Sequence, residues 1–225
     1  MGVTVDCDLR HMLGPVRDQG ARPTCVAFAV SDAHAAMRPD WVPLSCEYAF
    51  YHAIQRTGQT PDQGTTLKAM LTTLREDGQP HENKWSYIPT LPTDISQWMP
   101  PGDSEPVFRR DSGLGMVSVN EITNLLDAGI PAVVTMCLSH AFFQPDKSGI
   151  IDSNEPSDPA IRHAVIATAH GHNDDKNFIL VRNSWGMTWG IQGYAWVSEE
   201  YLAPKLLGIA ELTKDLSNVP TNKAA

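Results

Sequence analysis

The segment Gln19–Phe28 constrains this chain most, because it places a cysteine at the predicted start of a helix. From residue 26 to residue 37, Ala, Val and Phe recur with helical spacing. Thr24 is a good N-cap residue, and Pro23 before it cannot continue a helix backwards. Cys25 therefore lies in the first helical turn, where unpaired backbone N–H groups and the helix dipole stabilise an anion. Such a cysteine is either a nucleophile with a lowered pKa or a small buried core residue.

Two segments near the other end of the chain supply residues that a thiol nucleophile needs. His163 opens an apolar run that reads as a buried strand, and Asn183-Ser184-Trp185-Gly186 follows it. A thiolate needs a base that becomes a stabilising imidazolium, and the base needs a third group that holds its ring. Cys25, His163 and Asn183 are the right three residue types, in an order and with a wide separation that suit a papain-like enzyme.

These motifs resemble the papain-like cysteine peptidase family from about Val5 to about Leu212. The resemblance rests on Gln19-Gly20 before Cys25, on His-Ala-Val at 163–165, and on Asn-Ser-Trp-Gly-x2-Trp-Gly-x2-Gly-Tyr at 183–194. It implies one α+β domain over residues 1–225, with two lobes and a cleft between them. Residues of about 10–115 would form the mainly helical lobe and about 116–212 the mainly antiparallel β lobe, with a polar tail at 213–225.

The resemblance also implies roles for individual residues. Cys25 would attack the peptide carbonyl, and His163 would protonate the leaving amine and then activate water. Asn183 would orient His163 through its side-chain oxygen. Gln19 would donate its amide to the oxyanion together with the backbone N–H of Cys25, although a loop hydrogen bond is the alternative. Trp185 would shield the His–Asn contact from water, and core packing is the rival interpretation.

Substrate-binding residues follow from the same likeness. In the family, the glycine-rich turn before the helix that corresponds to residues 66–76 lines the substrate cleft. The alternative is that this turn does no more than cap the helix. The stretch before His163 sets the opposite wall. Val26 stands where the family usually has tryptophan, which leaves the substrate subsites open. The substrate-binding candidates are Gly64, Thr65, Ile161, Arg162 and Trp185.

The charge balance and the apolar runs exclude several classes of partner. The chain carries 26 acidic and 17 basic residues, a net charge of −9, which argues against nonspecific binding to nucleic acid or to an anionic membrane. No apolar run approaches the ~18 residues of a membrane span. The first residues resemble neither a signal peptide nor a pro-segment. We therefore expect a protein that is cytoplasmic or is delivered to a target cell without a cleaved signal peptide.

The four cysteines predict neither disulfides nor a metal site. Many secreted relatives have a disulfide-bonded cysteine three residues before the nucleophile, but Arg22 stands there, which points to a reducing compartment. The cysteine spacing matches no zinc pattern. His170, His172 and the acidic pair at 174–175 lie in a predicted short, solvated loop, so we expect no metal there and no cofactor.

Periodicity and cap residues predict the other elements. Ser45 and Ser118 would cap two further helices, and the stretch 79–115 would be a loop with Arg109 and Arg110 on a solvated edge. Strands are predicted at 3–10, 131–138, 163–169, 177–182 and 209–212, with the third and fourth as an antiparallel pair joined by 170–176.

The sequence thus predicts a cysteine endopeptidase that acts on protein or peptide substrates through a thioester acyl-enzyme. We expect this peptidase to have narrow specificity. It could be a bacterial antagonistic effector toxin that is restrained by an inhibitor or immunity protein. Two alternatives stay open. One is an acyl-transfer or amide-hydrolysing enzyme with the same triad, and the other is a catalytically silent binding module.

Overall fold

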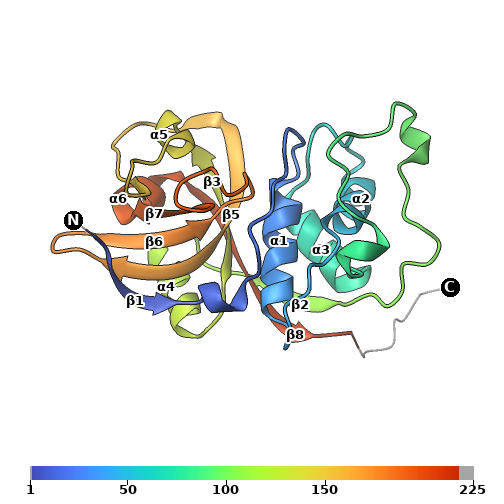
Figure 1. The fold of residues 1–225 in the computed structure, drawn as a ribbon, viewed down its shortest axis with the longest axis horizontal. Helices are drawn as coiled ribbons and strands as arrows, with labels where there is room; N and C mark the ends of the chain where they lie inside the picture. Colours follow the sequence, from blue (N-terminus) through green and yellow to red (C-terminus); the bar gives the residue numbers. More distant parts are fainter. Residues whose placement is uncertain (1, 218–225) are drawn as a thin grey trace.

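The structure, a computed structural model, describes residues 2–217, with the first three α-helices gathered on one side and a twisted sheet, together with the other α-helices, on the other (Figure 1). Helix α1 (Cys25–Ala36) stands between the sheet and the two helices α2 (Cys46–Thr57) and α3 (Leu67–Glu76). Every residue of α1 after Cys25 is buried. A helix that is apolar all round belongs in an interior. The α+β class is as predicted.

Two of the predicted N-caps, Ser45 and Ser118, cap their helices, and Thr66 caps the helix that was predicted to begin there. Ser45 and Thr66 accept hydrogen bonds from the backbone N–H three residues later, at 3.0 and 3.2 Å. Ser118 caps α4 (Val119–Asp127) in the same way, at 3.1 Å. Thr24 differs, because its hydroxyl makes no cap bond and instead lies 3.1 Å from the hydroxyl of Tyr87. The side chain before the nucleophile is therefore tied to a distant loop rather than to its own helix.

The sheet runs in the order β2-β8-β3-β5-β6-β7-β4, and β1 pairs with β5. All pairs are antiparallel except β4 with β7. Two short helices, α5 (His140–Phe143) and α6 (Glu199–Leu202), lie in its connections. The strands are β1 (Thr4–Asp8), β2 (Arg110–Leu114), β3 (Ala132–Leu138), β4 (Ile150–Ile151), β5 (Asp158–His172), β6 (Asn177–Arg182), β7 (Tyr194–Ser198) and β8 (Leu206–Asp215).

Strand β5 separates two hydrophobic cores, because successive side chains of a strand point to opposite faces. Ala164 and Ile166 pack with α1, α2 and α3, whereas Val165 and Ala167 pack in the core on the other face, with α4 and α6. The apolar run that starts at His163 is therefore explained by burial on both sides. None of the helices within residues 2–217 is long and apolar enough to cross a membrane.

The structure corrects three sequence predictions. Strand β5 continues to its pairing partners on β1, so His170 and His172 lie on a strand and not in a loop. Strand β2 forms within the predicted loop by pairing with β8, and its Arg110 is 4% exposed rather than solvated. The two terminal nitrogens of Arg110 donate to the carbonyl oxygens of Met37 and Thr213 inside the protein. The predicted tail beyond residue 217 lies outside the described residues.

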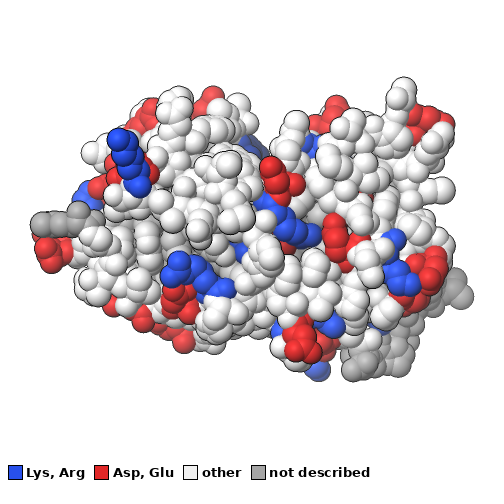
Figure 2. Space-filling view, viewed as in Figure 1, with Lys and Arg blue, Asp and Glu red and all other residues white. Residues whose placement is uncertain are grey.

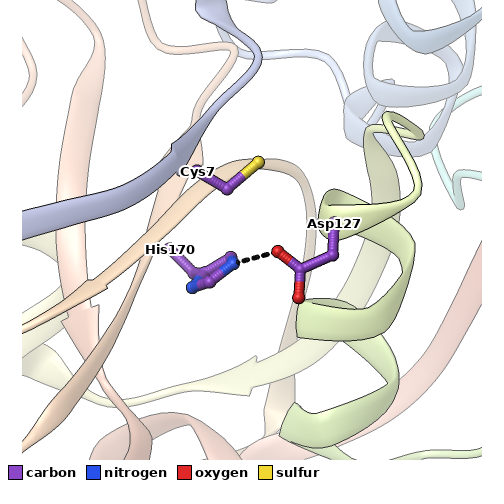
Figure 3. Close-up of side chains that lie close together, drawn as sticks. All are labelled: Cys7, Asp127 and His170. Atoms are coloured by element: carbon purple, nitrogen blue, oxygen red, sulfur yellow. Dashed lines mark hydrogen bonds and ion pairs between the residues drawn. The ribbon is translucent and has the colours of Figure 1, made fainter.

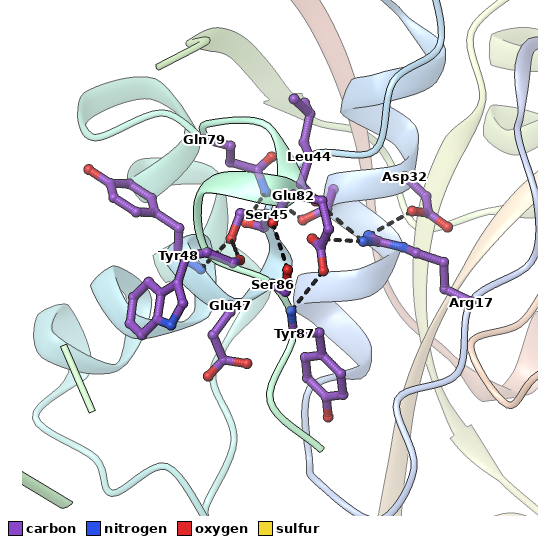
Figure 4. Close-up of polar contacts among 12 residues, drawn as sticks. Arg17, Asp32, Leu44, Ser45, Glu47, Tyr48, Gln79, Glu82, Ser86 and Tyr87 are labelled. Atoms are coloured by element: carbon purple, nitrogen blue, oxygen red, sulfur yellow. Dashed lines mark hydrogen bonds and ion pairs between the residues drawn. The ribbon is translucent and has the colours of Figure 1, made fainter. Parts of the chain in front are cut away.

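A buried polar network joins the segment before α1 to the helical side (Figure 4). Arg17 lies between two carboxylates, 2.7 Å from Asp32 and 3.3 Å from Glu82. Asp32 also pairs with the fully buried Arg182 at 2.9 Å. Burial raises the pKa of Glu82, and Arg17 opposes that shift. These charges fix the entry to α1 against the strand that precedes Asn183.

Acid should destabilise the fold through His34, whose Nδ1 is paired with Gln79 Oε1 at 3.1 Å. Burial lowers the pKa of His34 from 6.5 to about 3. In the unfolded chain His34 becomes protonated below about pH 6.5, whereas in the folded chain it stays neutral down to about pH 3. We expect the free energy of unfolding to fall by up to ~1.4 kcal/mol per pH unit in this window from His34 alone.

Urea denaturation at pH 6.5 and 4.5 measures this loss. The His34→Gln variant should show a smaller pH dependence, whatever its starting stability, and the exposed His140→Gln should behave as wild type. An unchanged slope in His34→Gln would contradict the assignment.

Candidate active site

Cys25 is the first residue of α1 and is partly exposed. Burial raises the pKa of its thiol, and backbone N–H groups of Ala164, Val26 and Cys25 itself act in the opposite direction without cancelling it. Burial therefore outweighs the effect of the backbone N–H groups on the pKa of this thiol. Because Ala164 follows His163 on β5, its influence on the thiol places Cys25 beside that strand.

His163 and Asn183 are both buried and directly hydrogen-bonded. His163 Nε2 lies 2.7 Å from Asn183 Oδ1. The same oxygen accepts from the backbone N–H of Ser184 at 2.8 Å, and a backbone N–H can only donate, which fixes the orientation of the amide. Nε2 therefore carries the proton and Nδ1 is left as the acceptor. Burial lowers the pKa of His163 to about 4, opposed by the bond to Asn183.

Aromatic side chains surround this hydrogen bond. The ring of Trp185 lies 4.5 Å from that of His163, and Phe142 contacts both. Phe143 stacks on Trp185 at 5.2 Å, and the two rings are inclined by only 15°. The indole N–H of Trp189 donates to the carbonyl of Phe142 at 3.0 Å. The sequence prediction named Trp185 but missed the two phenylalanines of α5.

Gln19 is held between two segments of the site. Its amide nitrogen donates to the carbonyl of Arg22 at 2.8 Å, and its amide oxygen accepts from the Ser184 hydroxyl at 2.7 Å. Its backbone N–H also donates to the carbonyl of Ser184 at 2.8 Å. The loop hydrogen bond that was the alternative for Gln19 is thus present, and it occupies only one of the two N–H groups of the amide. Ser184 had no role in the sequence prediction.

A cavity of about 480 Å³ brings Cys25 and His163 together. Three of the predicted substrate-binding residues line it, namely Gly64, Thr65 and Arg162, whereas Ile161 and Trp185 are not among its lining residues. Gly64 has a φ of +77°, and a Cβ atom there would lie 3.1 Å from the carbonyl oxygen of Pro23. The glycine is needed both for its backbone conformation and for the close approach of this turn to the segment before Cys25.

Arg22 anchors the loop before the nucleophile to α2. Its guanidinium pairs with the fully buried carboxylate of Glu47 at 2.7 and 3.0 Å. Glu47 also accepts from the indole N–H of Trp98 at 2.6 Å and from the backbone N–H of Ile88 at 3.1 Å. At position 22, where many secreted relatives have a disulfide-bonded cysteine, this chain therefore has an ion pair in which both oxygens of the Glu47 carboxylate are hydrogen-bonded.

The four cysteines carry free thiols. We therefore expect a reducing agent to raise activity, by keeping Cys25 reduced, and to leave the melting temperature unchanged. Differential scanning calorimetry with and without dithiothreitol, beside an activity assay, measures both. A fall of several degrees in the melting temperature on reduction would show that a disulfide stabilises the protein.

On the face drawn in Figure 2, acidic and basic side chains are interspersed, and Lys and Arg form no continuous basic patch there. This agrees with the net charge of −9.

Comparisons with known proteins agree with the geometry of the site. The sequence profile described as "Papain family cysteine protease" matches residues 3–211. A peptidase C1-like protein of Acanthamoeba polyphaga mimivirus is 26% identical over 224 residues, which cover 89% of this chain and 71% of that protein. A cathepsin L-like proteinase of Fasciola hepatica is 25% identical over 190 residues, covering 80% of this chain and 55% of that protein. The chain thus spans between about half and three quarters of the length of these relatives.

Solved structures show the same fold. The cysteine protease xylellain from Xylella fastidiosa superposes with a TM-score of 0.78 at 19% identity, covering 95% of this chain and 87% of that one. A Carica candamarcensis cysteine protease, solved in complex with E-64, gives a TM-score of 0.71 at 22% identity, covering 92% of this chain and 97% of that one.

Proposed function

Because the chain belongs to the papain family of cysteine proteases, we propose that it is a cysteine endopeptidase whose triad is Cys25, His163 and Asn183. The 2.7 Å bond from His163 Nε2 to Asn183 Oδ1, at a cavity that Cys25 and His163 share, carries this proposal. Asn183 holds the ring so that Nδ1 is the nitrogen available to the thiol.

The first chemical step is a proton transfer within the pair. Burial favours the neutral thiol of Cys25 as long as His163 is uncharged. It likewise favours the neutral imidazole of His163 as long as Cys25 is uncharged. Moving the thiol proton to Nδ1 creates a thiolate and an imidazolium side by side, and their mutual attraction offsets the desolvation of both. The thiolate then attacks the peptide carbonyl, and His163 protonates the leaving amine. A thioester remains, which water hydrolyses with His163 as the base.

Gln19 supplies a donor for the oxyanion. Since one N–H of its amide is used by the carbonyl of Arg22, the second is left for the substrate oxygen. The Ser184 hydroxyl fixes the orientation of the amide by donating to its oxygen. A donor that is held in place before the reaction stabilises the developing charge without reorganisation.

Replacing Gln19 with alanine should lower turnover by about 10²–10³, as losing one oxyanion donor does elsewhere. Gln19→Glu, which keeps the shape but replaces the N–H group by an oxygen, should lose at least as much. The exposed Gln97→Ala serves as the control and should match wild type. Steady-state kinetics on a fluorogenic peptide measure the effect, and a Gln19→Ala enzyme with wild-type turnover would refute the role.

The cavity supports a preference for substrates with an aliphatic side chain near the scissile bond. Leu67, Ala160 and Leu207 supply apolar surface, and Thr135 lies among them. Arg162 adds a single positive charge to the lining, which favours a neighbouring acidic side chain. We propose that these features give the narrow specificity expected from the sequence.

Mapping new N-termini in a lysate treated with the enzyme, with the Cys25→Ala variant as control, tests endopeptidase activity. New N-termini with a shared pattern support it. Products joined to an added amine in preference to water would indicate acyl transfer instead. Absence of both cleavage and labelling by an electrophilic peptide would indicate a silent binding module.

A more specific form of this proposal is that the peptidase is an antagonistic effector restrained by an immunity protein. A partner that covers the cavity at Gly64, Cys25 and His163 would exclude substrate, which is the simplest form of inhibition. We expect expression in a bacterial cytosol to arrest growth with wild type and not with Cys25→Ala at matched protein level. Equal growth, with wild type active on a peptide in the lysate, would eliminate the toxin.

A further inference from the structure

A second cluster of reactive side chains lies on the β side, away from the cavity that holds Cys25. Cys7 on β1, His170 on β5 and Asp127 at the end of α4 each offer one ligand atom, and these atoms lie within 4.8 Å of one another (Figure 3). We propose that Cys7, Asp127 and His170 form a binding site for a zinc ion.

The fold brings the three residues together from distant parts of the sequence. Cys7 and His170 are direct partners in the antiparallel pairing of β1 with β5, so their side chains lie on the same face. Helix α4 packs against that face, and the carbonyl of its Leu126 accepts from the Cys7 thiol at 3.3 Å. Asp127 follows as the last residue of α4. Figure 3 shows His170 and Asp127 joined by a hydrogen bond, with the Cys7 side chain beside them on the neighbouring strand.

The donor set suits zinc in particular. Zinc takes thiolate, imidazole and carboxylate ligands, at about 2.3 Å for sulfur and about 2.0–2.2 Å for nitrogen and oxygen. Around a tetrahedral ion such ligand atoms lie about 3.3–3.7 Å apart. His170 Nε2 and Asp127 Oδ1 are already 2.7 Å apart, and no pair exceeds 4.8 Å. Shifts of about an ångström complete the site, with water as the fourth ligand.

A carboxylate stands behind the histidine, as it does at many zinc sites. The Asp6 carboxylate lies 3.8 Å from His170 Nδ1 and 2.9 Å from His172 Nδ1. When Nε2 binds a metal, Nδ1 carries the ring proton and faces that carboxylate. The competing explanation is a simple surface ion pair of His170 with Asp127, beside a Cys7 thiol that donates only to the Leu126 carbonyl, and metal titration distinguishes the two.

The site is separate from the catalytic pair, although both use β5. His163 and His170 are seven positions apart on this strand (170 − 163 = 7), which corresponds to about 23 Å. Cys25 and His163 are themselves a thiol and an imidazole and could capture zinc. The experiment therefore uses the full chain with Cys25→Ala, which leaves Cys7, Asp127 and His170 intact.

The metal-free Cys25→Ala protein is titrated with Co²⁺ and then with Zn²⁺. We expect one equivalent of Co²⁺ to give the thiolate-to-cobalt absorption band and tetrahedral visible bands, and one equivalent of Zn²⁺ to abolish them. A competing chelator gives the zinc affinity. Cys7→Ser and His170→Gln should each weaken it by about 100-fold or more, and Asp6→Asn by about 10–100-fold.

Two residues outside the cluster supply matched controls. Cys137→Ser and the exposed His140→Gln change the same residue types outside the proposed site and should bind zinc as the parent protein does. Zinc should also raise the melting temperature of the parent and not that of Cys7→Ser. Absence of the thiolate band in the folded parent overturns the proposal without any variant, and so does a band that survives in Cys7→Ser.

Discussion

Replacing Cys25 or His163 with alanine should reduce turnover of a peptide substrate by roughly 10⁴-fold or more. In the proposed mechanism Cys25 forms the bond to the substrate and His163 moves the protons, and no other described side chain that lines the cavity is a thiol or an imidazole. Initial rates on a fluorogenic peptide measure the loss. Because the effects of residues that act as a unit are not additive, the turnover of the double variant should be no lower than that of the less active single variant.

Cys137→Ala is the matched control for the cysteine, since Cys137 is a buried thiol on β3 outside the proposed site. It should retain near wild-type turnover and labelling by an electrophilic peptide, whereas Cys25→Ala should lose both. Turnover that persists in a folded Cys25→Ala enzyme would remove Cys25 as the nucleophile.

Asn183→Ala should keep measurable activity, because Asn183 orients the ring and does not react. The bond from Asn183 Oδ1 selects the tautomer that leaves Nδ1 free. Without this hydrogen bond, Nδ1 would be unprotonated and directed at the thiol in only a fraction of the enzyme molecules. The packing of Trp185 against the His163 ring would still restrain the ring. An Asn183→Ala enzyme as inactive as His163→Ala would assign it a larger role.

Glu47→Gln should lower the free energy of unfolding by about 3–5 kcal/mol, because it leaves the buried Arg22 charge without its partner. The Glu47 side chain is 0% exposed and that of Arg22 is 7% exposed, so water cannot replace the lost interaction. Urea denaturation followed by tryptophan fluorescence measures the change. Turnover should fall too, because Arg22 belongs to the loop that leads into Cys25.

The exposed pair of Lys84 with Asp103, at 2.9 Å, offers the comparison. Asp103→Asn makes the same chemical change at a carboxylate that is 85% exposed, and should cost less than about 1 kcal/mol. Similar losses for the two variants would show that burial of the Arg22–Glu47 pair has no special effect on stability.

Local signals in the sequence predicted local structure well. Ser45, Thr66 and Ser118 begin helices because each accepts a backbone N–H within its own first turn, an interaction that depends on neighbouring residues alone. The pairing of His163 with Asn183 came from a resemblance over distant motifs, and the 2.7 Å contact agrees with it.

Long-range partners could not be predicted in this way. Arg110 was placed on a solvated edge because its acceptors, the carbonyls of Met37 and Thr213, lie far away in the sequence. The same is true of Arg22, whose partner Glu47 is on another helix. His170 was assigned to a loop because only pairing with β1 extends β5 so far.

The pairing of β1 with β5 has a consequence for how the protein is made. Strand β1 is synthesised before its partner β5, which lies more than 150 residues later (158 − 4 = 154). Contacts that close so long a loop form late and slowly. Cys25 is therefore synthesised long before His163 and Asn183, and a nascent chain carries a thiol without the base that activates it. Under the proposed mechanism, the order of synthesis itself therefore delays proteolysis until the β side has been translated.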